Sequence, residues 1–199
     1  MISVITVTYN NYDDLHRTLH SLDQVDGIES VVVNGGDCDK TKKLLSDFEG
    51  IAISEPDKGI SDAFNKGVSL ATGENVMFLN SGDVLLSPNY LKEAEKIINF
   101  NPEISFIHSD LIYNDRISGD FRLTALQPFF FRTPPLGRGM PYHHQSMVVR
   151  KNVFDKTGMF NLRYKISMDF DWVCRLHNHG LNGYYWNDEP VVKMDGGGL

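Results

Sequence analysis

The chain has 199 residues, of which 41% are hydrophobic and 23% charged, with a net charge of −7. This composition is ordinary for one globular domain with a sizeable buried core. The negative charge argues against a general nucleic-acid-binding protein, since such proteins concentrate Lys and Arg to neutralise phosphates. It still permits binding of an anionic small molecule, which needs only local cations and amide donors.

Two further features concern the cellular compartment. Cys38 and Cys174 form neither a metal-binding spacing nor a disulfide framework, which favours a reducing cytoplasm. The first ten residues have a strand pattern without a basic segment or a cleavage site, so we expect no signal peptide. Because no apolar run reaches membrane-spanning length, we expect a cytoplasmic protein, including one bound peripherally to the inner face of the membrane.

Residues 1–84 alternate predicted strands with predicted helices. Compact apolar runs between turn formers predict strands over residues 2–8, 28–33, 51–54 and 75–79. Apolar residues at helical spacing predict helices from Asp13, around residues 40–48 and over residues 60–70. The last of these helices should turn four residues inward: Ile60, Phe64, Gly67 and Val68. This alternation predicts a parallel, doubly wound α/β sheet.

The pattern loosens in residues 85–199. Helices are predicted from Pro88 and over residues 169–179, and strands over residues 104–107, 111–113, 146–149, 183–186 and 191–194. Residues 127–142 are rich in Pro, Gly and aromatic residues and predict a long loop or lid. No linker composition separates the halves, so we expect one domain over residues 1–199 with lobes 1–84 and 85–199. The abrupt Gly-rich end leads us to expect a missing C-terminal tail.

Asp83 follows the strand predicted over residues 75–79 through the turn Asn80-Ser81-Gly82. In open α/β sheets, ligands bind at the carboxyl ends of the strands. A hard cation that bridges a diphosphate takes oxygen ligands from one or two carboxylates. Asp83 is therefore a candidate ligand for Mg²⁺ or Mn²⁺, although Gly-Asp after a strand is also typical of a simple turn.

Several segments, in this order, resemble family 2 glycosyltransferases of the GT-A fold. They are Thr8-Tyr9-Asn10-Asn11, residues 34–41, residues 55–67, Ala71-Thr72-Gly73, residues 79–83, and Met168-Asp169-Phe170-Asp171-Trp172 with Arg175. Residues 55–67 resemble the subgroup that builds bacterial surface polysaccharides. Two positions depart from the family pattern. Asn34 stands where Asp is usual, and Ser81 stands where the first Asp of an Asp-x-Asp motif is usual, so one metal carboxylate is missing.

The resemblance implies a GT-A fold, with a Rossmann-like nucleotide half and a smaller mixed acceptor half. It also implies an inverting glycosyltransferase that takes a sugar from a nucleoside diphosphate sugar, for which we expect a UDP-sugar. The expected acceptor is a hydroxyl group of a growing bacterial surface glycan or of an undecaprenyl-linked molecule. The alternative is a non-catalytic or degenerate nucleotide-sugar-binding homologue, which Ser81 and Asn34 motivate.

Other enzyme classes are disfavoured by the first loop. A dehydrogenase would carry Gly-x-Gly-x-x-Gly after the first strand, and a nucleotidyltransferase would open with a Gly- and Arg-rich loop. Neither pattern occurs in this sequence.

The residues expected to bind the donor follow the predicted strands. They are Thr8, Tyr9, Asn10, Asn34, Asp57, Lys58, Asp62, Lys66, Ser81 and Gly82. Asp57 could accept hydrogen bonds from a base imide or a ribose hydroxyl, or simply form the turn before Gly59. Lys58 and Lys66 could offset phosphate charge, or could lie with Asp62 on a solvated helix face.

Asp169 is the candidate general base, because an acceptor alcohol attacks poorly until a positioned group takes its proton. It could also cap the following helix, in which Asp171 and Arg175 have the spacing of a structural pair. His144 and Gln145 are candidate contacts for the acceptor or the diphosphate, or ordinary polar packing at the start of a strand.

The segment Phe129-Phe130-Phe131-Arg132 combines three aromatic residues with a cation. It could plug the core beneath the predicted loop. It could also form a lip that touches a lipid-linked acceptor or the membrane interface, where aromatic and basic residues are favourable.

Overall fold

A computed structural model describes residues 1–115, 117–125, 140–186 and 188–196. Within these residues the larger sheet has seven strands, in the order β10-β6-β9-β4-β1-β2-β3. The strands are β1 (Ile2–Thr8), β2 (Ile28–Asn34), β3 (Ile51–Ser54), β4 (Asn75–Phe78), β6 (Ile104–Ser109), β9 (Val148–Arg150) and β10 (Asn182–Trp186). Only β9 runs antiparallel to its neighbours β4 and β6.

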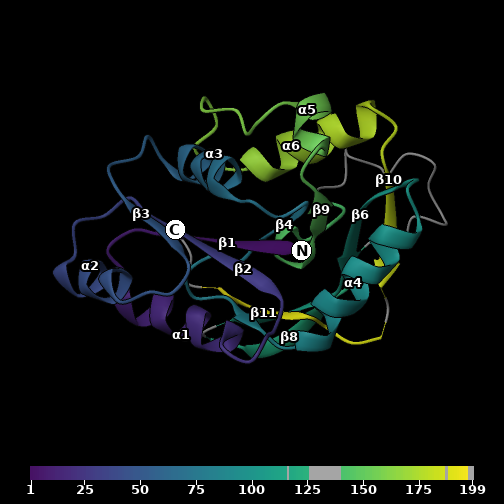
Figure 1. The fold of residues 1–199 in the computed structure, drawn as a ribbon. Helices are drawn as coiled ribbons and strands as arrows, with labels where there is room; N and C mark the ends of the chain where they lie inside the picture. Colours follow the sequence, from purple (N-terminus) through teal and green to yellow (C-terminus); the bar gives the residue numbers. More distant parts are fainter. Residues whose placement is uncertain (116, 126–139, 187, 197–199) are drawn as a thin grey trace.

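Six helices of the described chain cover the two faces of this sheet (Figure 1). They are α1 (Tyr12–Leu22), α2 (Asp39–Ser46), α3 (Ile60–Leu70), α4 (Pro88–Phe100), α5 (Val153–Thr157) and α6 (Met168–Asn178). Helices α3, α5 and α6 lie on one face, whereas α1, α2 and α4 lie on the other. The predicted mostly parallel, doubly wound sheet is therefore confirmed.

Strand β1 is buried along its whole length because helices cover both sheet faces. Successive side chains of a strand point to opposite faces. Ile5 and Val7 accordingly join the core beneath α3, and Ile2 and Val4 join the core beneath α4.

Helix α3 packs closely on β1 at Gly67. A Cβ atom at Gly67 would lie 2.3 Å from Ile5 Cγ2, so the missing side chain allows the helix to approach the strand. Phe64 and Val68 are buried as predicted. Ile60 is 37% exposed, contrary to the prediction, because it begins the helix at the edge of the contact.

A smaller mixed sheet lies beside the larger one. Its strands are β5 (Val84–Leu85), β7 (Leu111–Asp115), β8 (Gly119–Leu123) and β11 (Val192–Asp195), in the order β5-β11-β7-β8. Strand β11 pairs antiparallel with β5 and parallel with β7. The end of the chain therefore returns to the loop that follows β4.

The elements differ from the sequence-based expectations in four places. Strands β5 and β8 and helix α5 were not predicted, since β5 has only two residues, β8 is largely exposed and α5 has only five residues. Residues His144–Ser146 form a 3₁₀ turn, and the strand expected from residue 146 begins at Val148. The Ser146 hydroxyl holds this turn by donating to the carbonyl oxygens of Ser109 and His143.

The predicted lid over residues 127–142 falls mostly on residues 126–139, and the predicted lip at 129–132 falls entirely on them. These residues lie outside the described part of the chain. Among the described helices, none has the length and hydropathy required to cross a membrane.

Candidate active site

The carboxyl ends of three neighbouring strands bring the predicted donor loops together. Because β4, β1 and β2 are adjacent in the sheet, the residues that follow them lie side by side. The Thr8 hydroxyl lies 3.4 Å from the Ser81 hydroxyl. The backbone of Ser81 donates to the carbonyl oxygen of Val7, and that of Gly35 donates to Thr8. The loops after β4 and β2 are thus both tied to β1.

The loop after β1 is shaped by Asn10, whereas its neighbour Tyr9 is 68% exposed. Asn10 has a φ of 52°, in the left-handed region that Asn tolerates better than most residues. Its side-chain oxygen accepts hydrogen bonds from the backbone amides of Asp37 and Cys38 at 2.8 and 3.0 Å. Asn10 therefore fastens the first loop to the second.

Asn34 is fully buried at the end of β2. Its amide nitrogen donates to the carbonyl oxygen of Gly36 and to the Ser54 hydroxyl, and its side-chain oxygen accepts from the Gly36 amide. This placement does not support a direct contact between Asn34 and the nucleotide, because these internal bonds engage both ends of a buried amide. Asn34 instead shapes the turn at residues 35–36.

Asp57 lies directly over that turn. A Cβ atom at Gly35 would lie 1.8 Å from Asp57 Oδ2, so only glycine leaves room for the carboxylate there. The other oxygen of Asp57 accepts a hydrogen bond from the Gly59 amide at 2.8 Å. Asp57 thus forms the turn before Gly59 and also faces the loop after β2. Its contact with a base imide or a ribose hydroxyl stays a prediction.

The cations of the same block differ in their surroundings. Lys66 Nζ lies 2.8 Å from Glu55 and 3.5 Å from Asp62, and it donates to the carbonyl oxygen of Pro56. The hydrogen bond from Lys66 to Glu55 raises the pKa of Lys66. Asp62 also accepts from the backbone amide of Lys58, whose side chain is exposed. Lys66 and Asp62 therefore brace the loop before α3, and Lys58 is the better placed cation for a phosphate.

Asp83 is 3% exposed at the base of the site. Its carboxylate accepts from the backbone amides of Asn80 and Asp195, each at 3.2 Å. Burial raises the pKa of Asp83 to about 6, although His144 and the two amides oppose that shift. The nearby carboxylate of Asp195 raises it further. Asp195 was not predicted from the sequence, since only the return of β11 brings it here.

The metal expected at Asp83 would depend on the substrate for most of its ligands. Within the described residues, no group of three or more His, Cys, Asp or Glu side chains could hold a metal ion. Mg²⁺ is often held by one or two carboxylates together with waters and substrate phosphates. The single acidic side chain of Asp83 fits that arrangement, in which the diphosphate supplies the remaining oxygens.

His144 and Asp169 form a contact that the sequence did not reveal. His144 Nδ1 lies 2.8 Å from Asp169 Oδ2, and His144 Nε2 lies 3.4 Å from the side-chain nitrogen Nδ2 of Asn80. His144 Nδ1 donates a hydrogen bond to the carboxylate of Asp169, which accepts it. His144 therefore links the first turn of α6 to the loop after β4, which contains Asp83.

Asp169 is held in its ionised form. Burial alone would raise its pKa, but the hydrogen bond and the charge of His144, together with the Phe170 amide, lower it below the usual value. Asp169 lies in the first turn of α6. The N-cap position is Ser167, two residues earlier, so Asp169 does not cap the helix as the sequence allowed. The predicted pair of Asp171 and Arg175 is present at 2.8 Å.

Gln145 lies apart from this group. It is buried, and its amide nitrogen contacts the Met194 sulfur at 2.8 Å. The placement favours packing against β11 over the contact with an acceptor or diphosphate that we expected.

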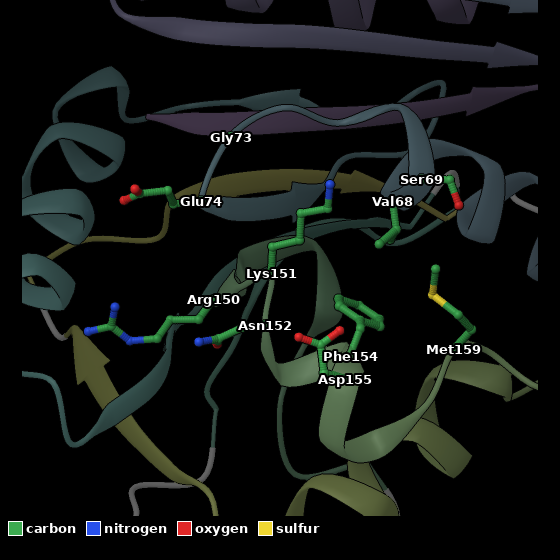
Figure 2. A pocket seen from close by; sticks show the side chains of 10 residues that line it. All are labelled: Val68, Ser69, Gly73, Glu74, Arg150, Lys151, Asn152, Phe154, Asp155 and Met159. Carbon is green, nitrogen blue, oxygen red and sulfur yellow. The ribbon is translucent and has the colours of Figure 1, made fainter.

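A separate pocket of about 520 Å³ lies at the other end of β4 (Figure 2). It is lined by Gly73 and Glu74, just before β4, and by residues 150–152, 154 and 155, while Asp83 follows the opposite end of the strand. Its cations are engaged with backbone, since Lys151 donates to the carbonyl oxygen of Ala71 and Arg150 to that of Ile104. The pocket does not belong to the candidate active site.

Comparison with solved structures identifies the fold. TarS of S. aureus in complex with UDP superposes with a TM-score of 0.73 at 17% identity, covering 98% of this chain and 60% of that one. The mannosyltransferase PcManGT of Pyrobaculum calidifontis, in complex with GDP-Man and Mn²⁺, superposes with a TM-score of 0.68 at 18% identity. The match covers 97% of this chain and 56% of PcManGT. The chain thus spans less than two thirds of either structure, and it has the GT-A fold of glycosyltransferases.

Sequence comparison narrows the class to a family. The sequence model of Glycosyl transferase family 2 matches residues 3–164, and the chain belongs to that family. An uncharacterized glycosyltransferase of Mycobacterium tuberculosis is 31% identical over 180 residues, covering 87% of this chain and 68% of the relative. A PGL/p-HBAD biosynthesis glycosyltransferase of Mycobacterium bovis is 31% identical over 211 residues, covering 100% of this chain and 78% of the relative.

Proposed function

We propose that this glycosyltransferase moves a sugar from a uridine diphosphate sugar to an acceptor hydroxyl, with inversion at the anomeric carbon. The proposed acceptor is a bacterial surface glycan or an undecaprenyl-linked molecule. The observation that carries the proposal is the contact between His144 and Asp169, 2.8 Å long, beside the loop that contains Asp83. It places an ionised carboxylate next to the strand ends where α/β sheets bind their ligands.

Each step of the transfer has a candidate residue. Asp169 takes the proton of the acceptor hydroxyl, because its lowered pKa keeps it ionised at neutral pH. His144 positions Asp169 through Oδ2, while the Phe170 amide donates to Oδ1, and His144 does not itself take the proton. The attacking oxygen then displaces the diphosphate from the opposite face of the sugar, which gives inversion.

The diphosphate is the leaving group, and its charge must be stabilised. A divalent ion, Mg²⁺ or Mn²⁺, bound with Asp83 would supply Lewis-acid stabilisation of that charge. PcManGT, which shares the fold, is described in complex with GDP-Man and Mn²⁺. Lys58, whose side chain is exposed, and the backbone of the loop after β4 are the donors that we propose for the diphosphate.

The nucleotide proposal rests on the loops after β1 and β2. Asp57 lies over Gly35 and can accept hydrogen bonds from a base imide or ribose hydroxyl. TarS, with the same fold, is described in complex with UDP and with UDP-GlcNAc. Thermal shift against UDP, GDP and dTDP tests the base, since a ligand that binds only the folded state raises the melting temperature. A larger shift with GDP or dTDP would contradict the uridine assignment.

The acceptor proposal draws on a relative and on the sequence of residues 55–67. The M. bovis relative is named for PGL/p-HBAD biosynthesis, and residues 55–67 resemble enzymes that build surface polysaccharides. Transfer to a panel of glycan and undecaprenyl-linked acceptors tests this part of the proposal.

The chemistry is tested by Asp169→Asn, which keeps the shape of the side chain and removes most of its basicity. We expect the turnover number to fall by about 10²–10⁴-fold, the usual contribution of general base catalysis, with donor affinity almost unchanged. Asp13→Asn is the matched control, because Asp13 is an exposed first-turn residue of α1. NMR of the product reports the anomeric configuration.

Two results would contradict the assignment. One is transfer by Asp169→Asn at the wild-type rate, and the other is a product that retains the configuration of the donor. A protein that binds the donor and never turns over with any acceptor would instead support a non-catalytic nucleotide-sugar-binding homologue.

A further inference from the structure

Exposed apolar side chains concentrate in the α5–α6 loop, residues 158–167. Met159, Leu162, Tyr164 and Ile166 are 40%, 47%, 45% and 83% exposed. Isolated exposed apolar residues are common on protein surfaces, but a cluster of them marks an interaction surface.

The same loop is basic. Arg163 and Lys165 alternate with the three apolar residues 162, 164 and 166, and both are exposed. No Asp or Glu occurs among residues 158–167. The loop is therefore a cationic and apolar surface on a chain whose net charge is −7.

The backbone of the α5–α6 loop is fixed from below. Phe160 is buried against the rings of Phe64 and Phe78, at centroid distances of 5.4 and 5.3 Å. The Asn65 amide donates to the Phe160 carbonyl oxygen and its oxygen accepts from the Phe160 amide, both at 2.9 Å. The Ser61 hydroxyl donates to the carbonyl oxygen of Tyr164. The apolar side chains thus project from an anchored backbone.

The α5–α6 loop also lies at the rim of the candidate active site. It leads directly into α6, whose first turn contains Asp169. Its contact with Ser61 joins it to the start of α3, just after the segment that contains Asp57. In Figure 1 it is the green loop that passes above α3 between α5 and α6.

We propose that the α5–α6 loop docks the protein onto an anionic lipid bilayer. Leu162, Tyr164 and Ile166 would enter the boundary between headgroups and acyl chains, as apolar residues of interfacial segments do. Arg163 and Lys165 would pair with the lipid phosphates. An anionic bilayer repels an acidic protein in most orientations. The α5–α6 loop would therefore favour the orientation in which the candidate active site faces the membrane.

The inference does not depend on the proposed function, because vesicle binding is measured without donor or acceptor. The whole chain is sedimented with vesicles of phosphatidylglycerol and phosphatidylcholine, and with vesicles of phosphatidylcholine alone. We expect binding to the anionic vesicles, weaker binding to the neutral ones, and a loss of binding as salt is added.

Two double variants separate the contributions of the loop. Arg163→Gln with Lys165→Gln should weaken partition by about 25-fold, since each cation near an anionic surface contributes about fivefold. Leu162→Ser with Ile166→Ser should weaken it by about a hundredfold, since burial of each such side chain contributes about tenfold. Both pairs are exposed, so the thermal unfolding of the variants should match that of the wild type.

The matched control is Phe100→Ser with Ile117→Ser. These residues are 83% and 98% exposed and lie outside the loop, so the control should bind vesicles as the wild type does. Several outcomes would overturn the proposal: no binding to anionic vesicles, unchanged binding in either loop variant, or an equal loss in the control. Self-association through the loop, detected by light scattering without vesicle binding, would also overturn it.

Discussion

The contact between His144 and Asp169 separates positioning from proton transfer at the level of single residues. His144 also packs edge-on against Phe64, with ring centroids 6.0 Å apart. A phenylalanine at position 144 would keep this packing and lose the hydrogen bond to Asp169. The pair can therefore be tested without removing the candidate base.

His144→Phe should change the pH profile of the enzyme. His144 lowers the pKa of both Asp169 and Asp83, so its removal raises both values. The catalytic carboxylate must be ionised for activity. As the pH is lowered, the variant should therefore lose activity at a higher pH than the wild type does. The profile of kcat from about pH 3 to pH 8 measures the shift, because the pKa of Asp169 in the wild type lies below 3.8. An acidic limb that stays in place would show that His144 has only a packing role.

The negative charge of Asp83 should lower the unfolding free energy of the protein when no ligand is bound. Its folded-state pKa of about 6 lies above the ordinary value of 3.8. Protonated Asp83 favours the folded protein over the unfolded chain. This contribution to the unfolding free energy is complete below pH 3.8 and is lost as the pH rises through 6. The full difference corresponds to about 3 kcal/mol of unfolding free energy.

Asp83→Asn should accordingly be more stable than the wild type at pH 8 in the presence of a chelator. The gain should be less than about 3 kcal/mol, because the Asn side chain can accept only one of the two backbone hydrogen bonds that the carboxylate accepts. At pH 5 the gain should be about half as large, because Asp83 is then mostly protonated in the folded protein but already mostly ionised in the unfolded chain. The same variant should lose metal-dependent donor binding. Urea denaturation at both pH values checks the first part, and calorimetric titration of donor with Mn²⁺ checks the second. A variant that is less stable at pH 8 would contradict the account of Asp83.

At the level of elements, the packing of α3 on β1 sets the position of the loop that contains Asp57. Gly67→Ala adds a methyl group at a point that lies 2.3 Å from Ile5 Cγ2. Overpacking of this kind costs about 1–3 kcal/mol and outweighs the helix propensity gained from alanine, which is about 1 kcal/mol. We therefore expect a net loss of unfolding free energy, measured by urea denaturation.

Ser69→Ala is the control for this helix, since Ser69 is on its exposed face. We expect its unfolding free energy to stay within about 0.5 kcal/mol of the wild type, as for most surface substitutions. Equal stability of the two variants would show that α3 can move away from β1 without cost.

Most elements could be predicted because their local pattern agrees with their environment. Strand β1 is apolar throughout since both of its faces are covered, and the inward residues Phe64 and Val68 follow helical spacing. Strand β8 has no such signal, because four of its five residues are exposed and the hairpin with β7 depends on pairing alone.

At the level of the whole molecule, the candidate site shows where local pattern stops being informative. His144 and Asp169 were each identified from sequence, but their contact joins residues 25 positions apart through the packing of α6. Asp195 lies next to Asp83 only because β11 pairs with β5, across 112 positions. Asn34 has a polar side chain at a strand end, and only the structure reveals that its amide is used internally.

The position of β9 within the larger sheet has a consequence for the synthesis of the protein. Strands β1 to β4 are complete once residue 78 has been made, yet the outer edge of β4 receives its partner only with residues 148–150. At ribosomal rates this interval is on the order of ten seconds. During that time an apolar strand edge is unpaired, which is a template for aggregation. A growing chain of this protein should therefore depend on chaperones until β9 closes the centre of its sheet.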